Sequence, residues 1–143
     1  MSITTATERF ARGFAALNKD NLVQLAELYH DDMVFTDPLH TINGLAAMQA
    51  YCANLYANVT DIQFEFHHCQ ALNDNEAALR WTMTYQHPRL QRGQPIAVEG
   101  CSFVQFRGDK VCRHRDYFDA GALLYEHLPL LGRLIAWLKR RLA

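Results

Sequence analysis

Three ionisable residues, far apart along the chain, are the strongest candidates for acid–base chemistry. Asp37 precedes a proline, whereas Arg80 and Asp116 lie in segments where apolar and polar residues alternate. A carboxylate in an apolar pocket is desolvated, which raises its pKa and makes it a general acid or base. An arginine beside it polarises a bound oxygen or holds a water molecule. Together the three residues predict proton transfer, isomerisation or hydrolysis of a small molecule.

Each of these residues also has a purely structural interpretation. Asp37-Pro38 is typical of a turn in which the aspartate accepts hydrogen bonds from nearby backbone N–H groups. Arg80 and Asp116 are expected on one face of the sheet, where they would equally form a structural ion pair at the wide end of a pocket. The sequence leaves both alternatives open for Asp37 and for the pair.

The elements that must position these residues follow from periodicity. Apolar residues recur with helical spacing in three segments, 5–17, 22–29 and 44–55. Alternation of apolar and polar residues then predicts four strands, 62–67, 79–86, 96–106 and 111–118. Short turns join the strands, so the sheet is expected to be antiparallel. Helices followed by such a meander predict an α+β domain over residues 1–143, with three helices on the concave face of a curved sheet.

Composition narrows the class of protein. The 143 residues are half hydrophobic and carry a formal net charge of −1, which fits one globular domain and does not favour nucleic acid as a partner. The four cysteines show no C-x-x-C spacing and the seven histidines no metal-ligand spacing, so neither a metal nor another cofactor is expected. The polar N-terminal segment and the lack of a long apolar run predict a cytoplasmic protein with reduced thiols.

Two motifs resemble a known family. The run from Tyr29 to Pro38, followed by Gly44, and the run from His114 to Asp119 are similar to the SnoaL-like branch of the nuclear-transport-factor-2-like superfamily. The likeness covers residues 5–119. It implies a cone-shaped, cystatin-like fold over residues 1–119, with residues 120–143 as a helical extension. The superfamily contains isomerases, cyclases, hydrolases and non-catalytic binders, so a ligand carrier or sensor is the alternative to an enzyme.

The likeness to steroid delta-isomerases bears on Asp37. Asp37 matches the proton-shuttling base of those enzymes, whereas Gly13 and Ser102 stand where the two oxyanion donors would be. Loss of such a donor costs about 3–4 kcal/mol of transition-state stabilisation in other enzymes. Ordinary steroid isomerisation is therefore not expected, and the implied ligand is an apolar, oxygen-bearing molecule such as an isoprenoid, a polyketide or a steroid-like compound.

The likeness to limonene-epoxide hydrolases bears on the sheet. Asp116 matches a catalytic aspartate of the last strand and Arg80 a catalytic arginine, but Thr82 stands in place of a second aspartate. Phe35 and Asp37 replace the tyrosine and the asparagine that hold water in that family. The resemblance thus implies a new cluster of Asp37, Arg80 and Asp116. The residues expected to line the pocket around it are Phe14, Phe35, Tyr51, Thr82, Ser102, His114 and Phe118.

The two faces of the strand predicted over residues 79–86 bear on a possible partner. If Arg80 faces the pocket, the apolar set of Leu79, Trp81, Met83 and Tyr85 covers the convex side of the sheet. An exposed apolar face of this kind favours a homodimer through the sheets.

The C-terminal segment predicts an amphipathic helix. It begins near Pro129 and combines an apolar stripe of leucines with the basic residues Arg133, Lys139, Arg140 and Arg141. Three alternatives stay open for it. The helix docks on its own domain as a lid, exchanges with the partner of a dimer, or makes peripheral contact with a membrane surface. The last of these would make the chain a membrane-associated accessory protein.

Overall fold

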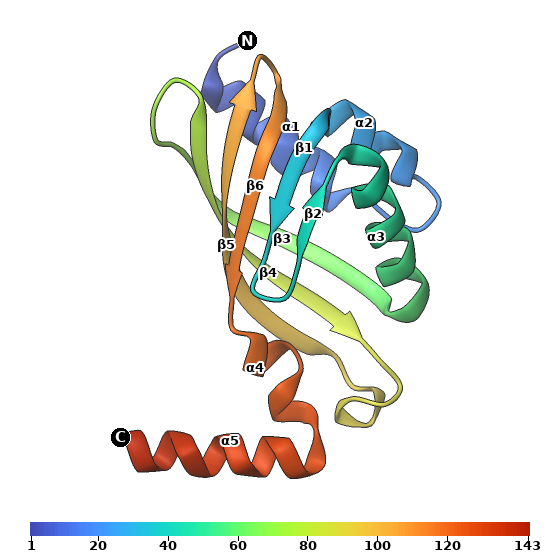
Figure 1. Cartoon of the computed structure of the whole chain (residues 1–143), viewed down its shortest axis with the longest axis vertical. Coiled ribbons are helices and arrows are strands. Elements are labelled where there is room, and N and C mark those ends of the chain that lie inside the picture. The colour runs from blue at the N-terminus through green and yellow to red at the C-terminus, as the bar shows by residue number, and fades with distance from the viewer.

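A strongly curved, six-stranded sheet forms the centre of the computed structural model, which describes residues 1–143 (Figure 1). The strand order is β2-β1-β6-β5-β4-β3. Strands β3 to β6 form the predicted antiparallel meander, whereas β1 runs parallel to β6 because no hairpin joins these two strands. The strands are β1 Tyr29–Thr36, β2 Thr41–Asn43, β3 Thr60–Ala71, β4 Glu76–Gln86, β5 Ile96–Arg107 and β6 Lys110–Phe118.

Helices α1, α2 and α3 precede the meander, as the sequence predicts. Ser2 caps α1, because its Oγ accepts a hydrogen bond from the Thr5 backbone N–H at 3.1 Å. Gly44 precedes α3 with a φ of +92°, a conformation that favours glycine. The second predicted helix is shorter than expected, since β1 already begins at Tyr29. The helices are α1 Ile3–Ala15, α2 Leu25–Leu28, α3 Leu45–Asn58, α4 Ala120–Leu123 and α5 Pro129–Leu142, with 3-10 turns η1 Leu22–Gln24, η2 Gln91–Gly93 and η3 Tyr125–His127.

The core fills the narrow end of the cone. Helix α1 packs against β3, and its Phe10 lies among residues from β1, β4, β5 and β6. A smaller apolar cluster of Tyr85, Leu90, Ile96 and Val98 lies at the other end of the sheet. The space between these two clusters, beneath α3, is not filled by either.

The faces of β4 are the reverse of those predicted. Leu79 lies opposite Ser102 and Trp81 opposite Gly100, and both apolar side chains are buried on the concave side. A Cβ on Gly100 would lie 2.4 Å from the Trp81 indole, so the close packing of the ring requires glycine. Burying an apolar stripe is favourable, whereas burying an unpaired arginine is costly, which explains the orientation.

This reversal also removes the argument for a dimer. Leu79, Trp81, Met83 and Tyr85 face the interior of the cone and do not form an exposed convex patch. The predicted homodimer stays a prediction without that support.

The C-terminal helices leave the cone at the end of β6. Helix α5 packs mainly against η3 and extends away from the sheet (Figure 1). The lid alternative is therefore wrong for α5 itself, because the helix does not lie over the cone. No helix of this structure combines the length and the apolar character needed to cross a membrane.

Candidate functional site

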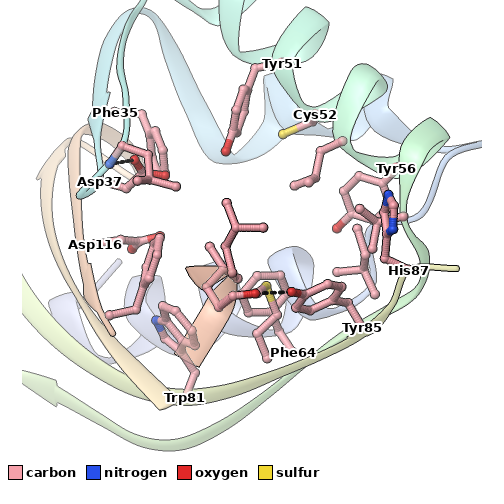
Figure 2. A pocket seen from close by; sticks show the side chains of 18 of the residues that line it. Phe35, Asp37, Tyr51, Cys52, Tyr56, Phe64, Trp81, Tyr85, His87 and Asp116 are labelled. Carbon is pink, nitrogen blue, oxygen red and sulfur yellow. Dashed lines mark hydrogen bonds between the residues drawn. The ribbon is translucent and has the colours of Figure 1, made fainter. Parts of the chain in front are cut away.

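The unfilled space beneath α3 is a cavity of about 440 Å³ (Figure 2). It lies between α3 and the concave faces of β3, β4 and β6. Of its 23 lining residues 19 are hydrophobic, so the few polar groups must decide how a ligand is oriented. Those polar groups include Asp37 and Asp116, two of the three predicted catalytic residues.

Asp116 lies on the inner wall, where β6 faces the cavity. Its side chain is 12% exposed, and Oδ1 accepts hydrogen bonds from Ser102 Oγ at 2.5 Å and from His114 Nε2 at 2.6 Å. The Trp81 indole N–H in turn donates to Ser102 Oγ at 2.8 Å. Asp116 Oδ2 makes no hydrogen bond within the protein. One carboxylate oxygen is thus fixed by the protein and the other is left for a ligand.

A buried tyrosine contacts the His114 ring nitrogen that does not contact Asp116. The Tyr29 hydroxyl lies 2.6 Å from His114 Nδ1. Burial, with a smaller contribution from the charge of Asp116, raises the pKa of Tyr29 well above its ordinary value, so the phenol keeps its proton and donates it. With the Tyr29 hydroxyl donating to Nδ1, the tautomer that fits this network carries its proton on Nε2, which faces Asp116 Oδ1.

Asp37 is both a turn residue and a residue of the cavity wall, the two alternatives that the sequence left open. Its Oδ1 accepts hydrogen bonds from the backbone N–H groups of Leu39 at 2.8 Å and His40 at 2.7 Å, as expected for a turn aspartate. The His40 ring lies 3.3 Å from the same oxygen. The side chain is only 4% exposed and also lines the cavity. The turn thus holds a carboxylate at the cavity wall.

Tyr51 of α3 points its hydroxyl into the cavity, on the side of the two carboxylates (Figure 2). The hydroxyl makes no hydrogen bond within the protein. Burial raises the pKa of Tyr51, and the charges of Asp37, Cys52 and Asp116 raise it further, so the phenol is a hydrogen-bond donor at neutral pH. Because both carboxylates act on it, Tyr51 marks the polar end of the cavity.

Arg80 and Thr82 do not belong to this site. Arg80 lies opposite Cys101, which lies opposite Tyr117, whereas Asp116 belongs to the other set of cross-strand partners. The Arg80 side chain is exposed on the outer face. Thr82 is on the same outer face, where its Oγ1 lies 2.7 Å from His67 Nε2. The predicted cluster of Asp37, Arg80 and Asp116 is therefore wrong for Arg80, which lies outside the cavity that the two aspartates line.

The other predicted pocket residues divide into two groups. Phe14, Phe35, Tyr51 and Phe118 line the cavity directly. Ser102 and His114 do not, because they are buried behind Asp116 and orient it.

Several lining residues were not predicted. Tyr56 and Cys52 follow Tyr51 on α3, and burial raises the pKa of each to about 12, so both stay neutral. Trp81 and Met83 were assigned to the wrong side of the sheet. Their burial could have been expected from the apolar stripe, but the partnership of Tyr29 with His114, 85 residues away, has no sequence signal.

The mouth of the cavity is formed by loops and the C-terminal turns. His87, Arg89 and Leu90 come from the β4–β5 connection, Leu123 ends α4, and Leu124 and Leu128 flank η3. The Tyr85 hydroxyl donates to the Leu123 carbonyl and ties these turns to the sheet. No group of three or more His, Cys, Asp or Glu side chains is placed to hold a metal ion.

Comparison with solved structures places this fold among several enzymes and proteins of unknown activity. A protein with a ketosteroid isomerase-like fold from Catenulispora acidiphila, in complex with trimethylamine, is 16% identical with a TM-score of 0.73, covering 87% of this chain and 93% of its own. A putative SnoaL-like polyketide cyclase from Jannaschia sp. is 11% identical with a TM-score of 0.73, covering 85% and 91%. An epoxide hydrolase of the LEH-like type from Mycobacterium tuberculosis is 18% identical with a TM-score of 0.71, covering 87% and 89%.

Sequence comparison identifies the family. A search of curated proteins finds no significant match. The model of the SnoaL-like domain, by contrast, matches residues 10–114, which is most of the chain and includes β1 and most of the cavity wall. The chain therefore belongs to the SnoaL-like family.

Proposed function

We propose that the protein binds a small apolar, oxygen-bearing molecule in the cone cavity and catalyses a proton transfer with Asp116 as the acid–base group. The observation that carries this proposal is the buried chain of hydrogen bonds from Tyr29 through His114 to Asp116 Oδ1. This series of hydrogen bonds fixes the Asp116 carboxylate at the wall of an apolar cavity, while Asp116 Oδ2 stays free. An aspartate with only a structural role would not need a free carboxylate oxygen at the wall of a cavity.

The cavity provides a complementary donor. Asp116 Oδ2 takes a proton from a carbon next to a carbonyl, or from a water molecule, and the Tyr51 hydroxyl donates to the oxygen on which negative charge develops. The apolar walls keep water out and so strengthen both interactions. Return of the proton to a different carbon gives isomerisation. In hydrolysis of an epoxide, the deprotonated water forms a bond to a ring carbon as the C–O bond of that carbon breaks, and the released oxygen takes up the proton that Asp116 has accepted. The similarity to a polyketide cyclase and an epoxide hydrolase supports chemistry of this kind.

A non-catalytic carrier or sensor is the second candidate. Two observations favour it: the cavity is lined mainly by hydrophobic residues, and Asp37 is already bonded to its own turn. A carrier uses the same cavity but needs no proton transfer.

One experiment separates the two. Trp81 lies in the cavity wall and Trp137 is the only other tryptophan, so Trp137→Phe leaves Trp81 as the sole fluorescent reporter of binding. A panel of apolar ketones, including 2-tetralone and a steroid ketone, is first screened for a change in Trp81 emission. The same ketones are then incubated in D2O, and exchange at the carbon next to the carbonyl is followed by NMR.

The enzyme proposal predicts exchange that Asp116→Asn lowers about a hundredfold or more while binding persists. Asp74→Asn, an identical change in an exposed turn, is the control and should have no effect. Binding without exchange by the wild-type protein would identify a carrier. A chain that binds none of the ketones would contradict both candidates for this ligand class.

A further inference from the structure

Helix α5 presents an apolar surface that nothing in the chain covers. Its large hydrophobic residues recur with helical spacing and are exposed, up to 83% at Leu130 and 88% at Leu142. We call this surface the α5 apolar face; its residues are Leu130, Leu131, Leu134, Trp137, Leu138 and Leu142. An apolar surface gathered on one helix is unusual for a face that meets only water.

The orientation of α5 leaves this face free. Gly132 lies against η3, because a Cβ at this position would come within 2.5 Å of the Glu126 carbonyl oxygen. Lys139 Nζ, on the same side, lies 2.5 Å from Glu126 Oε1. These two contacts hold the polar side of the helix against the chain. The α5 apolar face therefore points outwards.

The charge of α5 indicates the kind of partner. The helix carries four of the fourteen Lys and Arg residues and none of the fifteen Asp and Glu residues, so the rest of the chain holds ten basic and fifteen acidic residues. The Arg141 guanidinium lies over the Trp137 ring at 5.3 Å. A basic helix with leucines and a tryptophan on one side has the character of a helix that lies in a membrane interface.

We infer that α5 binds the surface of an anionic lipid membrane. The α5 apolar face enters the boundary between headgroups and acyl chains, and Arg133, Arg140 and Arg141 contact the negative headgroups. This inference does not depend on the chemistry of the cavity. A second copy of the chain is the competing occupant, and its oligomeric state in solution distinguishes it from a membrane surface.

The test uses the full chain and two vesicle compositions. Vesicles of phosphatidylcholine alone are compared with vesicles that contain about 30 mol % phosphatidylserine, by co-sedimentation at about 0.1 M and about 0.5 M NaCl. We expect binding to the anionic vesicles that falls at least tenfold at the higher salt. Light scattering without vesicles measures the oligomeric state in parallel.

Two sets of substitutions separate charge from apolar contact. Arg133→Gln, Arg140→Gln and Arg141→Gln together should weaken binding about a hundredfold, since each basic residue contributes about fivefold near such a surface. Arg12→Gln, Lys19→Gln and Arg80→Gln remove the same charge from exposed positions elsewhere and should change binding less than threefold. Leu134→Ser with Leu138→Ser should abolish binding while far-UV circular dichroism shows that the fold persists.

Three outcomes would overturn the inference. The first is equal partition of the protein to both vesicle types or to neither. The second is an equal loss of binding in the control set and the α5 set. The third is a dimer that Leu134→Ser with Leu138→Ser converts to a monomer, because a second copy would then occupy the α5 apolar face.

Discussion

The two carboxylates of the cavity are held in different ways, although both face the same ligand space. Asp37 is bonded by backbone N–H groups of its own turn, two and three residues away. Asp116 is bonded by side chains from β5 and β6, behind which stand Trp81 and Tyr29. A turn aspartate depends on local backbone geometry, whereas Asp116 depends on a buried network assembled from distant parts of the chain. The difference favours Asp116 over Asp37 as the acid–base group of the proposed reaction.

The largest expected effect is a difference in exchange rate between variants of the two carboxylates. Asp116→Asn should lower the ketone exchange rate about a hundredfold or more, whereas Asp37→Asn should lower it less than tenfold. The rates are measured by NMR in D2O on the same ketone. An equal loss in both variants would show that the carboxylates act as a pair, and a greater loss in Asp37→Asn would reverse the assignment.

High pH tests the buried neutral groups that surround the two carboxylates. Burial raises the pKa of Cys52 from 9.0 to about 12 and that of Tyr56 from 10.0 to about 12. Above pH 9 the unfolded chain loses these protons first, so the folded state binds more protons and loses stability as the pH rises. The free energy of unfolding in urea should fall by on the order of 2 kcal/mol between pH 8 and about pH 10.5.

A variant checks the cause of this alkaline loss. Cys52→Ala removes the group with the larger change in pKa, so its unfolding free energy should fall less steeply with pH than that of the wild-type protein. The absolute stability will also drop, because a buried side chain is shortened, but only the slope tests the assignment. An unchanged slope would place the titrating group elsewhere.

Tyr29→Phe tests whether the hydrogen bonds from Tyr29 through His114 support Asp116. It removes the donor to His114 Nδ1 and leaves that nitrogen buried without a partner, which costs about 1–3 kcal/mol. The free energy of unfolding is measured in urea, with Tyr117→Phe on the exposed outer face as the control. Because His114 would then be free to change tautomer, the exchange rate should also fall. A variant as stable and as active as the control would remove Tyr29 from the site.

The smallest effect is expected at Arg80. Its side chain lies in solvent on the outer face, so Arg80→Ala should change the unfolding free energy by less than about 0.5 kcal/mol and leave ketone binding unaltered. Trp81 fluorescence in the Trp137→Phe background measures both the unfolding free energy and the ketone binding. A strong loss of binding would mean that β4 presents its other face to the ligand.

Much of the fold could be predicted from the sequence because it depends on local periodicity. The alternation around His114 and Asp116 correctly placed both residues on one face of β6. Alternation states which residues share a face, but not which face is inward or how neighbouring strands are aligned. Arg80 was therefore assigned to the cavity by family likeness, against the burial preference of the apolar residues on either side of it. The hydrogen bond from Tyr29 to His114 depends on parallel pairing of β1 with β6, which no local pattern encodes.

Leu128 belongs both to the cavity wall and to the start of α5, where its carbonyl accepts a hydrogen bond from Gly132 N at 2.6 Å. A molecule in the cavity would contact this residue and restrict its motion, which would lower the entropy that α5 loses in the proposed docking. Thermodynamic reciprocity then requires docking of α5 to raise the affinity of the cavity by the same factor. The short junction at Leu128 would thus link the two proposed binding events.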